Sequence, residues 1–291
     1  MNNDSLLIYL KVYGRLQLDL LRDFTLPTMM WPENLPACGL KSIYVDCYGL
    51  PAESSELEDI LASGLSGIER TIAFTARSPE SLGQGVARAH ALGLRMFNLP
   101  VDMIFGNSSI RNLVNYSRHK HLVAAAGHLR VDWRQFLERF TPDSFKLPLS
   151  NAELVSLAME CPHHTAANSW SDLDNSTLKA GISLTRISPA LVTMIHHLPS
   201  PWLASFTSED VEFLSAHGEG AWDHNWLQLL ARQGRLRVMG SSELCFGIEL
   251  THDEASRPPV EPGSANQELK FEQAGAATDL CHQFVTSLRQ K

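Results

Sequence analysis

Short apolar segments alternate with amphipathic ones along the first 140 residues of the chain. The apolar segments have the length of β-strands, and the segments between them carry apolar residues at helical spacing with few helix breakers. The predicted strands are Leu6–Val12, Leu40–Tyr48, Glu69–Thr75, Leu94–Leu99 and His121–Ala126, and the predicted helices are Arg15–Phe24, Ser54–Ala62, Glu80–Leu92 and Ile110–His119. This alternation predicts an α/β fold with a mostly parallel central sheet flanked by helices.

The alternation of strand-like and helix-like segments becomes less regular after residue 140. A helix is predicted over Asn151–Cys161, because Ser150 and Glu153 match the spacing of a capping box at its start. Later predicted elements are strands over Gly181–Ile187, Leu191–His196 and Arg235–Met239, a helix over Ser208–His217 capped by Ser208, and a final helix over Gln267–Lys291. Residues 251–266 contain three prolines and no periodicity, which is typical of a linker or surface loop. The predicted organisation is one α/β domain over residues 1–250, the linker, and a C-terminal helical extension.

Composition and charge narrow the functional classes. The chain is 44% hydrophobic and 19% charged, which is typical of a globular protein. Its 24 Lys and Arg against 32 Asp and Glu give a net charge of −8. This charge argues against a protein that holds nucleic acid or an anionic membrane through its overall charge, but it does not exclude binding by a local basic groove. The five cysteines are scattered without a C-x-x-C pair, and no stretch approaches the about 20 apolar residues of a membrane span. We therefore expect a cytoplasmic protein without a membrane span.

The sequence lacks the common nucleotide-binding and hydrolase motifs, so candidate chemistry is sought at the ends of predicted strands. Asp102 follows the strand that ends at Leu99, and Asn107 and Ser109 come shortly after it. A carboxylate at a strand end suits a hard cation such as Mg²⁺ or Mn²⁺ together with phosphate ligands. The same position is also typical of an aspartate that caps a helix or a turn, and the spacing alone favours this second interpretation.

Two further groupings lie in the carboxyl half. His196 and His197 close a predicted strand, where one imidazole could bind a metal, or one could be packed and the other solvated. Asp223 lies between Trp222 and Trp226, in a position that suits either a helix cap or the polar edge of a cleft whose aromatic faces stack on a sugar or a base.

Six short segments follow one another in an order that resembles a group of bacterial glycosyltransferase-like proteins with the GT-A, or nucleotide-diphospho-sugar transferase, type of fold. The resemblance extends from about residue 6 to about residue 250. The segments are Leu26–Thr28 with Asn34–Pro36, Asp102–Ser109, Ala126–Val131, Ile195–Pro199, Trp222–Asn225 and Val238–Glu243. Each match is short, and their common order carries the resemblance.

The resemblance implies transfer of a sugar from a nucleotide-diphospho-sugar donor to a carbohydrate or other acceptor, assisted by Mn²⁺ or Mg²⁺. Asp102 would be the carboxylate that holds the metal or the diphosphate, and His196 would be a further ligand. Asp223 would act as the catalytic base or orient the acceptor. The residues that would bind the substrate are Asn107, Ser109, Arg130 and Trp222, with Arg130 offsetting phosphate charge.

The chain departs from the pattern of this group at four positions. Asn107 and Ser241 replace aspartates, and Leu198 and Gln84 replace histidines. Each change removes a charge or a ligand, which leaves a second hypothesis: a catalytically inactive accessory protein that binds a nucleotide or a glycan. A third hypothesis is a different α/β transferase or nucleotide-binding module, in which Asp102 and His196 would not converge.

Overall fold

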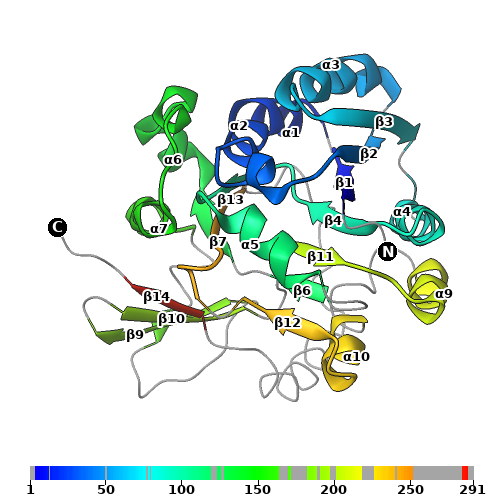
Figure 1. The fold of residues 1–291 in the computed structure, drawn as a ribbon. Coiled ribbons are helices and arrows are strands. Elements are labelled where there is room, and N and C mark those ends of the chain that lie inside the picture. Colours follow the sequence, from blue (N-terminus) through cyan, green and yellow to red (C-terminus); the bar gives the residue numbers. More distant parts are fainter. Residues whose placement is uncertain are drawn as a thin grey trace, which may run out of the picture.

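Figure 1 shows a computed structural model of the protein. The structure describes residues 4–12, 14–49, 51–76, 78, 80–118, 123–125, 128–163, 170–171, 182–188, 191–196, 201–217, 226–239, 241–251 and 284–287. For residues 51, 170–171, 182–188, 191–196, 217, 228, 251 and 284–287 it describes the backbone alone.

The largest sheet has seven strands in the order β12-β6-β11-β4-β1-β2-β3. These strands are β1 (Ser5–Lys11), β2 (Ser42–Gly49), β3 (Glu69–Ala76), β4 (Arg95–Leu99), β6 (Val123–Ala125), β11 (Trp202–Ala204) and β12 (Leu236–Val238). All neighbouring strands are parallel except β11, which runs antiparallel to β4 and β6. The predicted fold class, a mostly parallel sheet flanked by helices, is therefore confirmed.

Helices follow most of these strands. The α-helices are α1 (Arg15–Leu20), α2 (Leu26–Met29), α3 (Ser54–Gly64), α4 (Ser81–Ala91), α5 (Ser109–Tyr116), α6 (Trp133–Arg139), α7 (Asn151–Glu160), α9 (Ser208–His217) and α10 (Leu227–Arg232). A π-helical segment, η1 (Leu21–Thr25), joins α1 to α2, and short 3-10 helices lie at η2 (Leu35–Cys38), η3 (Pro51–Glu53) and η4 (Pro142–Phe145). The helix predicted over Arg15–Phe24 thus continues through η1 into α2.

The main sheet is buried on both faces. Successive side chains of a strand point to opposite faces, so Leu6, Ile8 and Leu10 of β1 enter one core and Leu7 and Tyr9 enter another. Helices α1, α2 and α3 cover the first face, and α4, α9 and α10 contribute to the core of the second (Figure 1). Burial on both faces explains why the parallel strands read as continuous apolar runs in the sequence.

Two smaller sheets accompany the main one. The first has the order β5-β13-β7 and consists of β5 (Met103–Phe105), β13 (Gly247–Thr251) and β7 (His128–Asp132). The second has the order β14-β10-β9-β8 and consists of β14 (Phe284–Ser287), β10 (Leu191–His196), β9 (Ile182–Ser188) and β8 (Trp170–Ser171). The sequence pattern did not predict β5, β7 or β13, because each is short and none alternates clearly.

Local details confirm one predicted cap and correct two other predictions. Ser150 and Glu153 form the capping box of α7 through reciprocal hydrogen bonds. The hydroxyl of Thr207, and not that of the predicted Ser208, accepts the backbone N–H of Asp210 at the start of α9. Within the predicted helix 267–291 the structure describes residues 284–287, which form β14 paired with β10. The predicted linker lies outside the described residues apart from Thr251, which ends β13.

Candidate functional site

The crevice for a ligand in an open α/β sheet lies at the carboxyl ends of the strands, where the strand order reverses direction. In this protein the reversal falls between β1 and β4, because β1 pairs with β2 on one side and with β4 on the other, all in parallel. Strand β4 ends at Leu99, and Asp102 lies in the turn that follows, directly before β5. The topology therefore places Asp102 at this crevice.

A polar cluster lies near Asp102 and joins two strands of the small sheet, β7 and β13, to the turn before β5. His128 and Arg130 are two residues apart on β7, so their side chains share one face, and Glu249 of β13 pairs in register with Arg130. Oε2 of Glu249 lies 2.5 Å from Nε2 of His128, and Oε1 of Glu249 lies 3.2 Å from Nε of Arg130. The backbone carbonyl of Asp102 accepts a hydrogen bond of 2.9 Å from the N–H of Leu250, which follows Glu249.

The cluster is shielded from solvent, and this changes its electrostatics. The side chain of His128 is 3% exposed, that of Glu249 is 15% exposed and that of Arg130 is 19% exposed. Burial, followed by the negative charge of Glu249, raises the pKa of Asp102 to about 7, although His128 and Arg130 act in the opposite direction. A carboxyl group with such a pKa can exchange a proton near neutral pH, which is typical of functional sites.

Two buried threonines of the first helical segment hold the chain beside Asp102. The hydroxyl of Thr25 donates to the carbonyl of Val101 over 2.9 Å and accepts the N–H of Met103 over 3.1 Å. The hydroxyl of Thr28 accepts the N–H of Phe105 over 3.2 Å. These bonds fix the backbone on both sides of Asp102, so part of the Leu26–Thr28 segment serves as a frame for the site.

Asn34 fixes the loop that follows β5. Its amide donates to the carbonyls of Thr28 over 2.8 Å and Gly106 over 3.2 Å, and its oxygen accepts the N–H of Ile110 over 3.0 Å. Within the described part of the chain, Ser108 is the one residue other than glycine with a positive φ, 81°. This left-handed conformation costs energy for a residue with a Cβ, and the surrounding hydrogen bonds maintain it.

Ser109 belongs to the interior of this frame. It is fully buried, and its hydroxyl donates to Oδ1 of Asn151 over 2.8 Å and lies 3.0 Å from the carbonyl of Phe246. The same hydroxyl accepts the N–H of Phe246 over 3.0 Å. Ser109 thus ties α5 to α7 and to the segment before β13, and the structure does not place it on an open surface where the predicted substrate contact would occur.

The structure describes the side chains of some predicted site residues and leaves others outside the described part. Asp102 and Arg130 lie in one cluster, bridged by Glu249. Asn107 is partly exposed in the same loop as Ser109, and its side-chain oxygen accepts the N–H of Glu33 over 3.2 Å. The backbone of His196 ends β10, but its side chain lies outside the described part, as do Trp222 and Asp223. The predicted convergence of Asp102 with His196 and Asp223 therefore stays a prediction.

The sequence pattern did not single out His128 or Glu249. The spacing of His128 and Arg130 in the run Ala126–Val131 could have revealed the histidine, because alternate residues of a strand share a face. Glu249 is the one charged residue in the apolar run Phe246–Leu250, and it belongs to no recognised motif. The pairing of β13 with β7 brings Glu249 next to His128 and Arg130.

The ligands for a divalent metal are incomplete among the residues that the structure describes. No group of three His, Cys, Asp or Glu side chains in that part of the chain is placed to hold a metal ion. Asp102 provides one carboxylate, and the carboxylate of Glu249 already faces His128 and Arg130. These residues do not fit Mn²⁺ or Mg²⁺ on their own, so a metal there would need ligands from elsewhere.

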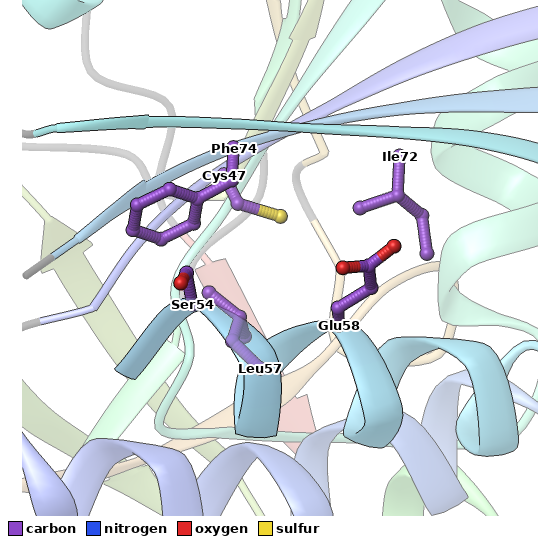
Figure 2. Close-up of a pocket in the computed structure, with 6 residues that line it drawn as sticks. All are labelled: Cys47, Ser54, Leu57, Glu58, Ile72 and Phe74. Atoms are coloured by element: carbon purple, nitrogen blue, oxygen red, sulfur yellow. The ribbon is translucent and has the colours of Figure 1, made fainter. Parts of the chain in front are cut away.

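A small cavity beneath α3 does not compete with this site. Figure 2 shows its lining residues, which come from β2, β3 and α3: Cys47, Ser54, Leu57, Glu58, Ile72 and Phe74. Its volume is about 50 Å³, whereas small-molecule sites usually measure about 300–1,000 Å³. Burial, with the nearby charge of Asp46, raises the pKa of the Cys47 thiol far above its usual range, so the thiol is not reactive.

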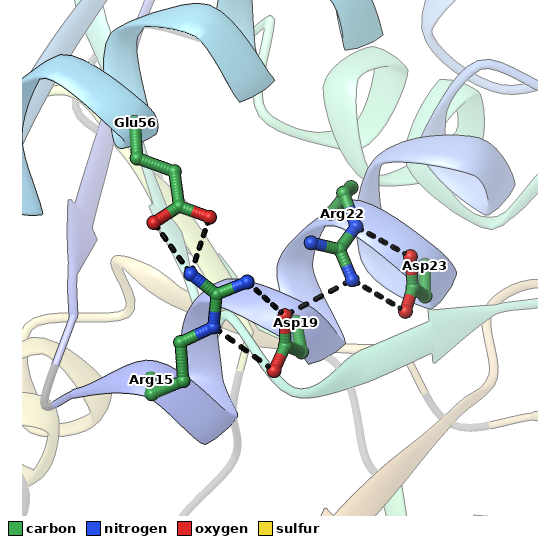
Figure 3. Close-up of polar contacts among 5 residues, drawn as sticks. All are labelled: Arg15, Asp19, Arg22, Asp23 and Glu56. Carbon is green, nitrogen blue, oxygen red and sulfur yellow. Dashed lines mark hydrogen bonds and ion pairs between the residues drawn. The ribbon is translucent and has the colours of Figure 1, made fainter.

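A charged network joins the helices that follow β1 and β2 (Figure 3). Arg15 at the start of α1 lies 2.5 Å and 2.6 Å from the two carboxylate oxygens of Glu56 in α3, and it also binds Asp19. Arg22 continues the network to Asp19 and Asp23. The side chains are about half exposed to solvent, where water and salt screen ion pairs. We interpret the network as a tie between helices and not as a binding site.

No helix in the described ranges is long and apolar enough to cross a membrane.

Comparison with known proteins does not identify a family. No family model matches the chain, and no curated protein matches it. Among solved structures, the crystal structure of GalNAc-T7 with UDP, GalNAc and Mn²⁺ is similar with a TM-score of 0.49 and 11% identity, over 94% of this chain and 48% of that chain. The chain thus spans about half the length of GalNAc-T7.

Two other solved structures show weaker similarity. A putative glucose-1-phosphate thymidylyltransferase from Bacillus anthracis in complex with a sucrose has a TM-score of 0.42 and 10% identity, covering 94% of this chain and 95% of that one. The inositol-1-phosphate CTP transferase from T. maritima has a TM-score of 0.39 and 8% identity, covering 93% and 96%. With all TM-scores below 0.5, we draw no conclusion about family or function from these similarities.

Proposed function

We propose that this protein is a glycosyltransferase that moves a sugar from a nucleotide-diphospho-sugar donor to a carbohydrate or other acceptor. One observation carries the proposal: Asp102 lies at the switch point between β1 and β4, in a partly buried cluster with Arg130. This is the crevice in which open α/β sheets bind their ligands. The order of the six sequence segments that resemble nucleotide-diphospho-sugar transferases supports the same function.

The chemistry of the cluster suits a leaving diphosphate. Breaking the bond between sugar and phosphate leaves negative charge on the diphosphate, which a preorganised cation in a shielded site stabilises. Arg130 provides such a cation, and its planar guanidinium matches the geometry of phosphate oxygens. The bonds from Thr25, Thr28 and Asn34 keep the adjacent backbone rigid, so little reorganisation is needed when the donor binds.

Three further roles belong to the proposal. Asp102 and His196 would hold Mn²⁺ or Mg²⁺ together with the donor phosphates, and the metal would supply additional positive charge when bound. Asp223 would act as base for the acceptor hydroxyl, or orient it. Trp222 and Asn107 would contact the substrate.

Titration calorimetry with UDP-, GDP- and CMP-linked sugars, with and without Mn²⁺, tests the proposal. We expect one donor class to bind, and we expect Asp102→Ala to abolish the metal-dependent part of that affinity. Asp143→Ala is the matched control, because Asp143 pairs with Lys146 on the surface, outside the cluster. Failure of every donor to bind the unmodified protein would contradict the proposal.

The alternative of an inactive accessory protein is favoured by one sequence observation: Asn107 and Ser241 stand where the resembling group has acidic residues. An assay for release of the nucleoside diphosphate separates the two functions. The transferase releases it when acceptor is supplied, whereas the accessory protein binds the donor without releasing it.

A further inference from the structure

The guanidinium of Arg130 is anchored on one side only. Its Nε lies 3.2 Å from Oε1 of Glu249, at ion-pair distance but without hydrogen-bond alignment. In the part of the chain that the structure describes, neither terminal nitrogen of Arg130 has a hydrogen bond to protein. The contact with Glu249 therefore leaves most of the five N–H donors of the guanidinium unused.

Glu249 is held firmly enough to orient Arg130. It lies in β13, the central strand of the small sheet, and its backbone is paired with β5 on one side and β7 on the other. Its second carboxylate oxygen lies 2.5 Å from Nε2 of His128, at ion-pair distance without hydrogen-bond alignment, and the His128 side chain is 3% exposed. A carboxylate whose backbone is paired on both sides and whose second oxygen packs against a buried imidazole has little freedom to follow a moving arginine.

The side of Arg130 that remains open is the side that recognises phosphate. The two terminal nitrogens of a guanidinium form a fork that binds two oxygens of a phosphate group at once, which a lysine cannot do. Arg130 is 19% exposed, so a ligand can reach the cluster without unfolding it.

We infer that Glu249 is a positioning residue that holds Arg130 through its Nε side and leaves the terminal nitrogens to bind a diphosphate. The inference rests on the proposed function for the source of the diphosphate, namely the donor. The competing explanation is that Glu249 serves only to neutralise His128 and Arg130 within the fold. The two explanations differ in whether the effect of Glu249 on diphosphate binding depends on Arg130.

A double-mutant cycle tests this dependence. Binding of inorganic pyrophosphate and of UDP and GDP is measured by calorimetry in metal-free buffer for the unmodified protein, Arg130→Ala, Glu249→Ala and the double variant. Because charge-assisted hydrogen bonds are strong, we expect Arg130→Ala to weaken pyrophosphate binding by about tenfold or more. Glu249→Ala should weaken it by about three- to tenfold, and the double variant should bind no more weakly than Arg130→Ala.

Conservative variants separate positioning from folding. Glu249→Gln keeps an oxygen that can face Arg130, so we expect it to recover part of the lost affinity, and it also serves if Glu249→Ala does not fold. Arg130→Lys keeps the charge without the fork, so it should bind pyrophosphate more weakly than the unmodified protein and more tightly than Arg130→Ala. Glu160→Ala is the matched control, because Glu160 pairs with Arg139 on the surface, and its affinity should be unchanged.

The outcomes distinguish this inference from the proposed function. Additive losses in the cycle, or unchanged affinity in Glu249→Ala, would overturn the positioning role even when nucleotides bind. Pyrophosphate binding that depends on both residues, without binding of any nucleotide or nucleotide-sugar, would support the positioning role and contradict the transferase. No binding of pyrophosphate or nucleotides to the unmodified protein would overturn both.

Discussion

The side-chain oxygen of Asn34 accepts a hydrogen bond of 3.0 Å from the backbone N–H of Ile110, in the first turn of α5. The same side chain donates to two carbonyls, so one buried amide connects the end of the first helical segment to the loop after β5. The position of the loop after β5 therefore depends on a residue far from it in the sequence.

Asn34→Ala should destabilise the protein. The change removes the partner of the Ile110 N–H and of two carbonyls in a buried region, where an unsatisfied group costs about 1–3 kcal/mol. We expect the free energy of unfolding, measured in urea, to fall by about 3 kcal/mol. Asn115→Ala is the control, because Asn115 is exposed on α5. Equal stability of the two variants would show that the Asn34 bonds contribute nothing.

Gly106→Ala should also destabilise the protein, for a steric reason. An added Cβ at this position would lie 1.9 Å from Oδ1 of Asn151, which is itself bonded to Ser109. Overpacking of this kind usually costs about 1–3 kcal/mol. In Gly49→Ala the new Cβ would meet Phe74 at 3.5 Å, an ordinary contact, so this control should unfold near the wild-type temperature. Equal melting temperatures of Gly106→Ala and Gly49→Ala would contradict the close packing of Gly106 against Asn151.

We expect Asp210 to make the free energy of unfolding decrease at acidic pH. Although burial raises its pKa, the bonds from Arg235, the Thr207 backbone and Trp226 lower it overall. A lowered carboxyl pKa gives stability that is present above the ordinary value of 3.8 and is lost as the pH falls through the folded-state pKa.

Asp210→Asn tests this dependence. It breaks a buried ion pair, in which Arg235 Nη2 lies 2.5 Å from Oδ2 of Asp210, and should cost about 3 kcal/mol at pH 7. The difference from wild type should shrink below about pH 4, as the Asp210 carboxylate becomes protonated. Asp143→Asn, at an exposed pair, should change little. A difference that is constant from pH 7 to pH 3 would contradict the assignment.

Asp102 should have the opposite pH dependence. Burial and the charge of Glu249 raise its pKa to about 7, so the folded state holds this proton more tightly than the unfolded state. The contribution of Asp102 to stability is therefore present below the ordinary value of 3.8 and is lost as the pH rises toward 7. Asp102→Asn removes the ionising group, and its stability relative to wild type should increase between pH 4 and pH 7.

Direct titration of the Asp102 carboxyl by ¹³C NMR measures the same property. We expect a midpoint near 7 in the unmodified protein. Glu249→Gln should lower the midpoint, because it removes a negative charge, and Arg130→Ala should raise it. A midpoint close to 4 in the unmodified protein would contradict the clustering of the two carboxylates.

The sequence predicted the parallel strands and the helices between them, because burial on both faces leaves continuous apolar runs. It also predicted that Asp102 follows the end of a strand, which is its position after β4. Glu249 could not be predicted, since its role arises from the pairing of β13 with β7, two segments far apart in the chain. Ser109 was named as a substrate residue through the resemblance of the segment Asp102–Ser109, and its burial against α7 and the segment before β13 could not be read from that segment alone.

The insertion of β13 between β5 and β7 has a consequence for the order of assembly. As the chain emerges from a ribosome, β1 to β4 can pair early, whereas Asp102 and Arg130 must wait for residues 247–251 before Glu249 reaches them. Closing so long a loop adds little entropic cost beyond that of a shorter one, but it delays the final contact. A nascent chain that stops before residue 247 would thus hold most of the large sheet and still lack the contact between Glu249 and Arg130.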